Sequence, residues 1–366
     1  VDERIPQLVA EQQGWFDDLV EHPVEQFTLE GQPLALYRGG FVASVDLSYR
    51  LVEGANRRNP IRVPLFIEFT PSQAGYLWAG APFEAMHGES IRLLYPGLPS
   101  ERQESYRALS QELLPEAETV LKQMADELNL GLPEALTIKV YERAQDMRAS
   151  ARLSLPSSTQ SPAWCEGQSS IKMRLDADAR PNDYRPVLAA QLARQLLHQA
   201  NVDSEWLLKG ASLYLASSVD GGKGRRDAEA ALDDLLDAVS KGTLYALAEM
   251  PPDKKLTPNE LRIASIQTLD TIDYLTKLYG HETLELLVTS QPEQDLDLAL
   301  QSATGRTLAE LEADWSESLT RGHARPEWIE VARAFDENAA YAHVEVLAAP
   351  DMGGRQAGSR GAEQAA

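Results

Sequence analysis

The stretch Tyr184–Ser217, YRPVLAAQLARQLLHQANVDSEWLLKGASLYLAS, decides how the rest of the chain is interpreted. Apolar residues recur in it every three or four positions, a spacing that predicts two consecutive helices. Pro186 fits the first turn of the first helix, where no hydrogen-bond donor is lost. The second helix is expected to begin after Asp203 or Ser204, either of which can cap its first turn. The apolar positions expected to be buried are Leu188, Ala189, Leu192, Ala193, Leu196, Leu197, Trp206, Leu207, Tyr214 and Leu215.

The two predicted helices resemble a pair found in the gluzincin metallopeptidases, in particular the peptidase MA-like branch. In that family Leu-Ala-His-Glu-x-x-His lies on one helix and Trp-Leu-x-Glu-Gly-x-Ala-x-Tyr-Leu lies on the next. The resemblance implies a zinc site in which two histidines four residues apart and a glutamate of the second helix bind the ion. The glutamate between the histidines then takes a proton from the metal-bound water.

The residues at the corresponding ligand positions of this chain do not suit zinc. Ala190 has no donor atom, Gln191 cannot act as a base, and Arg194 and Lys209 bring positive charge to a place where a cation is expected. The resemblance therefore implies a degenerate site at Ala190, Gln191, Arg194 and Lys209, with no catalytic residue, no metal ligand and no cofactor in this segment. We expect Arg194 and Lys209 to pair with carboxylates in place of the ion.

His198, one turn beyond Arg194, offers an alternative, because it could serve a relocated metal site. A catalytic zinc needs about three protein ligands. We therefore favour the interpretation that His198 packs against its neighbours at the end of an apolar helix.

The composition limits the class of partner. The chain has 366 residues, 43% of them hydrophobic, and a formal net charge of -22. Nucleic acids and anionic membranes would be repelled by this charge, so neither is expected as the main partner, and we favour a solvated acidic face. The expected partner is a protein or peptide. We expect no transmembrane segment and no signal peptide before the first helix. Cys165 is the single cysteine, so it has no partner for an intrachain disulfide.

Residues 1–88 read as a helix followed by antiparallel strands, a pattern that resembles the nuclear transport factor-like or cystatin-like fold. The expected helix is Ile5–Val20, burying Leu8, Val9, Phe16, Leu19 and Val20, and the expected strands are Phe41–Leu51, Ile61–Thr70 and Tyr76–Ala79, with a turn at Glu53–Pro60. Such a sheet can hold a small ligand in its concavity. We favour the interpretation that Trp15, Phe66, Phe69 and Trp78 are core residues.

Residues 89–325 follow the order of a gluzincin domain. Strands are expected at Ile91–Tyr95, Ala135–Tyr141 and Ile171–Leu175, the last as the edge strand beside the metal helix. Helices are expected from Pro99 and Ser100 to Leu128, at Ala144–Ala149, at Arg226–Ser240 before Gly242, and from a capping box at Thr257, Pro258 and Glu260 to Gly280. The segments YLTKLYGHETLELLV and TLAELEADWSESL resemble the C-terminal helices of peptidase MA-like proteins. The loop Pro156–Gly167 either borders the cleft or, as we favour, is a mobile surface loop.

Residues 326–366 are expected to be a linker and the start of another domain. Within Ala340–Ala366, the residues Leu347, Ala348, Gly354, Arg355, Gly358, Ser359 and Gly361 resemble the opening of zinc aminopeptidases of the leucyl aminopeptidase and glutamate carboxypeptidase type. A flexible Gly/Ala-rich end explains the same residues equally well.

The sequence thus predicts an α+β protein. It combines a small helix-plus-antiparallel-sheet domain with a thermolysin-like domain that has a mixed sheet and a helical C-terminal half. The expected function is that of an inactive metallopeptidase-like module with a structural, peptide-binding or accessory role. We expect it to be the front of a longer extracytoplasmic protein. The alternative is that it belongs to an active zinc aminopeptidase whose catalytic domain, with its zinc, follows residue 366.

Overall fold

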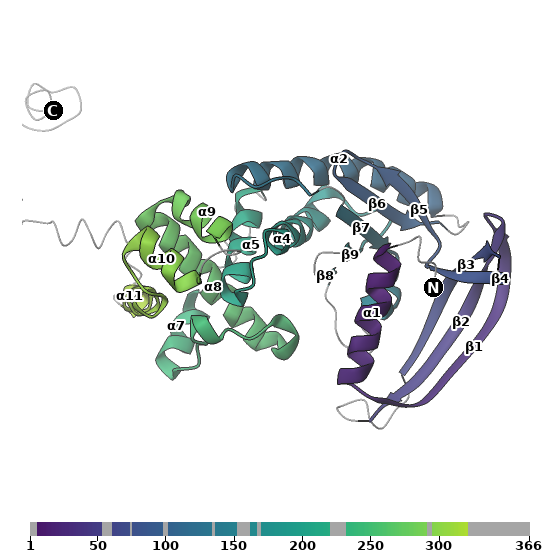
Figure 1. The fold of residues 1–366 in the computed structure, drawn as a ribbon, viewed down its shortest axis with the longest axis horizontal. Helices are drawn as coiled ribbons and strands as arrows, with labels where there is room; N and C mark the ends of the chain where they lie inside the picture. The colour runs from purple at the N-terminus through teal and green to yellow at the C-terminus, as the bar shows by residue number, and fades with distance from the viewer. Residues whose placement is uncertain are drawn as a thin grey trace, which may run out of the picture.

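Two β-sheets and a helical C-terminal half make up the part of the chain that the computed structural model describes (Figure 1). The described residues are 6–52, 61–73, 75–97, 102–133, 136–151, 162–166, 170–219, 232–290 and 295–320. The predicted α+β class is confirmed. The predictions for the turn at Glu53–Pro60, for Pro99 and Ser100, and for the tail from residue 326 onward lie outside the described residues.

The first sheet is a meander in which each strand pairs with the next strand along the chain. Its strands are β1 (Val24–Tyr37), β2 (Gly40–Leu51), β3 (Ile61–Ser72) and β4 (Gly75–Gly80), all antiparallel, in the order β1-β2-β3-β4. The three predicted strands are confirmed, and β2 alternates as expected, with Val45, Leu47 and Tyr49 buried. Strand β1 was not predicted; nearly all of its residues are exposed, so it carries no alternation of buried and exposed positions.

Helix α1 (Pro6–Glu21) lies between the first sheet and the rest of the protein (Figure 1). The predicted helix is confirmed, but its predicted buried face is wrong in part: Val9, Phe16 and Val20 are exposed. Glu11 and Asp18 are buried instead, and Trp15 packs with Leu19 against the first sheet. The helix buries the face that lies between the two sheets. Glu11 can lie on that face because Lys139 of the second sheet binds its carboxylate.

The second sheet is mixed and begins with a strand that lies inside the predicted first domain. Its strands are β5 (Phe83–His87), β6 (Ile91–Pro96), β7 (Leu136–Tyr141), β8 (Ala163–Glu166) and β9 (Ser170–Arg174), in the order β5-β6-β7-β9-β8. The pairs β6–β7 and β7–β9 are parallel, and the others are antiparallel. The prediction that Ile171–Leu175 is the edge strand is wrong, because β8 pairs with β9 on its outer side. Part of the predicted surface loop therefore forms a strand.

Helices lie on both faces of the mixed sheet and continue into the C-terminal half. They are α2 (Gln103–Glu127), α3 (Ala144–Ala151), α4 (Pro181–Gln199), α5 (Glu205–Val219), α7 (Leu232–Lys241), α8 (Pro258–Tyr279), α9 (His281–Ser290), α10 (Leu296–Thr304) and α11 (Leu308–Thr320), with short 3-10 turns η1 (Leu247–Glu249) and η2 (Asp253–Lys255). The predicted capping box of Thr257 and Glu260 starts α8, and Gly280 ends it at a φ of 93°. No helix in the described ranges is long and apolar enough to cross a membrane.

One large core joins the mixed sheet to the helical half. It runs from Ile91 and Leu93 on β6 through α2, α4 and α5 to Leu311 on α11. The first sheet has two smaller cores of its own, one of them beneath α1. The helix pair that the sequence singled out therefore lies inside the main core, between the mixed sheet and the C-terminal helices (Figure 1).

Candidate functional site

Helices α4 and α5 pack against each other, as the sequence predicted. The apolar rows of α4, represented by Leu188, Leu192 and Leu196, are buried, and so are Trp206 and Leu207 at the start of α5. Helix α4 begins earlier than predicted, at Pro181, so the placement of Pro186 in the first turn is wrong. The predicted set is otherwise buried, except that Tyr214 is only partly buried.

Gly210 of α5, which matches the glycine of the Trp-Leu-x-Glu-Gly motif, lies against α8. A Cβ added there would lie 2.6 Å from the carbonyl oxygen of Thr268 and 2.7 Å from Cγ1 of Ile272, both on α8. Only a residue without a side chain lets α5 and α8 approach this closely. Gly210 therefore allows α5 to pack closely against α8, which places the neighbouring Lys209 inside the core.

The four degenerate positions lie on the two facing helices. Ala190 is half-buried and packs against the main core, and Gln191 is half-buried beside it. The Arg194 side chain is 20% exposed and the Lys209 side chain 3% exposed. Neither cation points to bulk water, because both bind the carboxylate of Asp253 on η2.

Arg194 of α4, Lys209 of α5 and Asp253 of η2 form a charge cluster. Arg194 Nη1 donates to Asp253 Oδ2 at 2.7 Å, and Lys209 Nζ donates to Asp253 Oδ1. Burial by itself would raise the pKa of the Asp253 carboxyl, but the two cations and their hydrogen bonds outweigh it and hold that pKa below its usual range. Arg194 Nη2 also lies 3.8 Å from Glu205 Oε2. The hypothesis that Arg194 and Lys209 pair with carboxylates agrees with this geometry.

His198 is half-buried at the end of α4. Burial lowers the pKa of its imidazole, the charge of Arg194 lowers it further, and Asp203 opposes this. A neutral imidazole can bind a metal, but a protein site needs further ligands around it. Within the described ranges no three His, Cys, Asp or Glu side chains come together in a way that could hold a metal ion.

Strand β8 lies beside α4, where the sequence had placed β9. The thiol of Cys165 donates to Oε1 of Gln195 at 3.0 Å, which links the strand to the helix. Gln195 is fully buried, and its Nε2 has no hydrogen-bond partner among the described residues. The outermost described strand of the mixed sheet thus flanks the helix that carries Arg194.

Sequence reasoning missed Asp253 and Glu205 in the cluster. Asp253 follows Arg194 by 59 positions, and no periodicity or motif connects two residues at that separation. Glu205 lies in the first turn of α5, where an acidic residue is explained equally well by the helix dipole. The one usable signal was the need of a buried lysine for a nearby anion, which predicts a carboxylate without saying which one.

Comparison with known proteins gives a likeness among solved structures. No protein-family model and no curated protein matches the sequence. Among solved structures, the chain is similar to an M1 zinc metallopeptidase from Deinococcus radiodurans, with 16% identity, a TM-score of 0.39, and coverage of 81% of this chain and 61% of that one. A mutant of the same enzyme gives 16% identity, a TM-score of 0.37, and coverage of 80% and 61%. The same mutant bound to a Tyr-Ser-Ala substrate gives 14% identity, a TM-score of 0.34, and coverage of 80% and 60%. The chain thus spans about 61% of the length of the first of these structures.

Proposed function

We propose that this chain is a catalytically inactive, metallopeptidase-like module that binds an extended segment of a protein or peptide. The observation that carries the proposal is the carboxylate of Asp253 held between Arg194 and Lys209. In the family that the helix pair resembles, these helices hold a zinc ion. Here two cations, Arg194 and Lys209, stand at corresponding positions, and both bind Asp253 of η2.

The chemistry of the cluster supports inactivity. A hydrolytic zinc needs about three protein ligands and a base beside its water. Ala190 and Gln191 provide neither, and Arg194 and Lys209 would repel the ion. Each cation instead binds Asp253, so these three side chains link α4 and α5 to η2.

The position of β8 supports a binding role. An extended peptide can be recognised by main-chain hydrogen bonds and side-chain pockets, and this recognition needs no metal. Strand β8 is the outermost strand of the described mixed sheet on the side of α4. We therefore propose that the peptide lies next to β8 and α4. The proposal also includes an extracytoplasmic location for the protein.

The inactivity is tested by metal analysis of the purified chain and of a variant with a rebuilt site. The variant carries Ala190→His, Gln191→Glu, Arg194→His and Lys209→Glu, and its matched control carries only Ala190→His and Gln191→Glu. We expect less than about 0.1 zinc per chain in the parent and the control, and about one zinc per chain in the full variant, because a tetrahedral site needs its complete ligand set. Stoichiometric zinc in the parent that is lost on His198→Ala would overturn the proposal.

The binding role is tested by hydrogen exchange. A mixture of blocked, random-sequence hexapeptides is added to the full chain, and exchange is followed along both sheets. We expect protection that is concentrated in residues 163–166, with β1 as the internal control, since it is an edge strand of the other sheet. Protection that is equal in the two strands, or absent from both, would exclude a specific peptide site at β8.

A further inference from the structure

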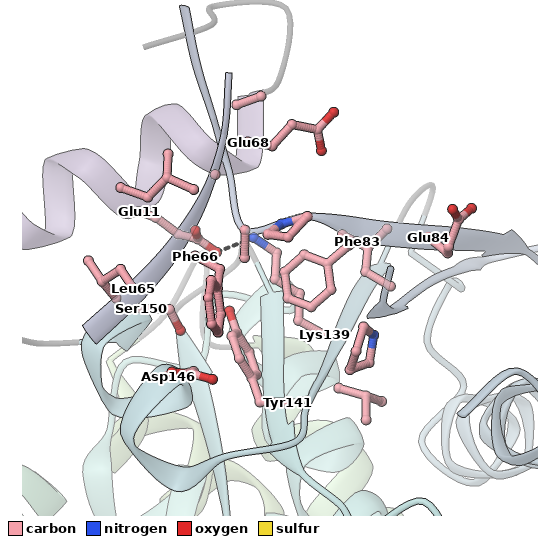
Figure 2. Close-up of a pocket in the computed structure, with 18 of the residues that line it drawn as sticks. Glu11, Leu65, Phe66, Glu68, Phe83, Glu84, Lys139, Tyr141, Asp146 and Ser150 are labelled. Carbon is pink, nitrogen blue, oxygen red and sulfur yellow. Dashed lines mark hydrogen bonds and ion pairs between the residues drawn. The ribbon is translucent and has the colours of Figure 1, made fainter. Parts of the chain in front are cut away.

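A cavity of about 630 Å³ lies between the first sheet and the mixed sheet, away from the α4–α5 pair (Figure 2). Its walls come from α1, β3 and β4 on one side and from β5, β6, β7 and α3 on the other. Lys139 and Tyr141 of β7 line it, whereas Ile138, on the opposite face of that strand, belongs to the main core. Ligand sites of proteins commonly enclose about 300–1,000 Å³. The cavity is therefore large enough for a small organic molecule.

Aromatic side chains make up much of its wall. Trp15 and Trp78 lie with ring centroids 5.6 Å apart, and Phe83 meets Tyr141 edge-on at 5.3 Å. Phe66 is a further wall residue, and the guanidinium of Arg143 lies 5.0 Å from its ring centroid. Aromatic faces attract cations because their quadrupole is negative above the ring. The cavity wall thus already holds one cation on an aromatic face.

Most of the charges that line the cavity are paired with each other. Glu11 binds Lys139, Arg38 binds Glu84 at 2.8 Å, and Arg143 binds Asp146 at 2.7 Å. Figure 2 shows the Glu11–Lys139 pair in the middle of the view, with the rings of Phe66, Tyr141 and Phe83 on one side of it and Glu68 on the other.

Glu68 is the exception among the carboxylates of this cavity. The residue is 7% exposed, lines the cavity, and forms no hydrogen bond or ion pair with another described residue. Burial raises the pKa of its carboxyl, Arg38 opposes this, and Glu84 adds to it. A buried carboxylate without a partner is costly, so its presence points to a group that binds it.

We propose that this cavity binds a small organic amine with an apolar or aromatic body, whose ammonium group pairs with Glu68 while its body packs against the aromatic wall. A primary ammonium supplies the hydrogen-bond donors that Glu68 lacks. The net charge of -22 also favours a cationic ligand over an anionic one. This ligand is independent of the peptide proposed for β8.

Unpartnered donors in the wall do not favour an anion instead. The indole N–H groups of Trp15 and Trp78 and the Nε of Arg92 lack an acceptor among the described residues. All three atoms are closed off from solvent, so an anion would have to displace the wall to reach them. The carboxylate of Glu68 is not enclosed in this way, so it is the better docking point.

The test is calorimetric titration of the full chain with three probes that share one ring and one chain length. Phenethylamine carries an ammonium group, 2-phenylethanol a hydroxyl group, and 3-phenylpropanoate a carboxylate. We expect saturable 1:1 binding of phenethylamine, weaker binding of the alcohol and the weakest binding of the acid. Tightest binding of 3-phenylpropanoate would overturn the proposal in favour of an anion site, and the absence of binding by all three probes would overturn it outright.

Three variants test whether the amine binds in this cavity and at Glu68. Glu68→Gln should weaken phenethylamine binding about tenfold or more, since the amide oxygen still accepts a hydrogen bond but the negative charge is lost, and should leave 2-phenylethanol binding unchanged. Glu30→Gln removes the same charge from an exposed position on β1 and should change neither affinity by more than about twofold. Ala85→Trp, at an exposed position of the wall, should abolish the binding of both probes by filling the cavity.

Unchanged phenethylamine binding in Glu68→Gln, or equal losses in Glu68→Gln and Glu30→Gln, would overturn the assignment to Glu68. Unchanged binding in Ala85→Trp would place the amine outside the cavity. Retained binding of 2-phenylethanol shows that a weakened variant is still folded.

Discussion

Two clusters in this protein have the same composition, one carboxylate bound by two cations, but they differ in burial. Glu11 binds Lys139 and Lys172, and these three side chains are 8%, 7% and 0% exposed. Asp253 binds Arg194 and Lys209, with 36%, 20% and 3% of the side chains exposed. The first cluster ties α1 to the mixed sheet, and the second ties α4 and α5 to η2.

Burial, more than the number of charges, determines how much each cluster contributes to stability. A charge in the interior depends on its partners, because water cannot replace a partner that is removed. A charge near the surface is screened by solvent, so its pairs contribute less. Changes to the Glu11 cluster should therefore affect stability more than equivalent changes to the Asp253 cluster.

The largest effect is expected from Glu11→Ala, which removes the shared carboxylate from two buried lysines. We expect a loss of about 3–5 kcal/mol in the free energy of unfolding, measured by urea denaturation. Asp17→Ala, on the exposed side of the same helix, is the matched control and should change it by no more than about 0.5 kcal/mol. Equal effects of the two substitutions would contradict the importance of burial.

A smaller loss is expected from Asp253→Asn, about 1–2 kcal/mol at neutral pH, because Asp253 is partly open to solvent. The pKa of Asp253 is lowered by folding, so the stability that its charge contributes is present above the ordinary aspartate pKa of about 4 and is lost as the pH falls through the lower folded value. The difference between the parent and the variant should therefore shrink below about pH 4 in thermal melts. A difference that grows in acid would be inconsistent with this sign.

Glu68→Gln changes a carboxylate that, unlike Glu11 and Asp253, binds no cation among the described residues. We expect a gain in stability of about 1 kcal/mol at pH 7, because the variant removes a buried charge that has no such partner. Folding raises the pKa of Glu68, so the parent is weakened above the folded pKa, and the gain should disappear below about pH 4, where both states are protonated. Thermal melts without ligand measure this, and a loss of stability at pH 7 would show that Glu68 has a partner in the folded chain.

The smallest effect is expected from Arg194→Lys, which keeps the charge but loses the fork that reaches both Asp253 and Glu205. An ammonium group binds one of the two carboxylates at a time. We expect a loss of about 0.5 kcal/mol in urea denaturation, and Arg194→Met should lose more. A lysine variant as unstable as the methionine variant would show that the fork geometry, rather than the charge, holds the cluster.

The sequence predictions were wrong or incomplete for features that depend on packing between distant segments of the chain. The face that α1 buries is set by the two sheets around it, so Val9 and Phe16 are exposed although the helix itself was predicted. The outermost strand was misplaced because four residues around Trp164 and Cys165 are too few to show a period. The partners of Arg194, Lys209 and Lys139 lie far away along the chain, and sequence spacing carries no information about them.

Features that depend on neighbouring residues were determined by the sequence alone. The apolar rows of α4, the capping box of Thr257 and Glu260, and the glycine stop at Gly280 follow from the spacing and stereochemistry of a few adjacent residues. The ligand chemistry of the helix pair also follows from the sequence, because the side chain itself decides whether a donor atom is present. The residues concerned are Ala190, Gln191, Arg194 and Lys209. Only the tertiary structure decided that Asp253 joins the two cations and that Glu68 lines a cavity, because both depend on which distant segments meet across a buried interface.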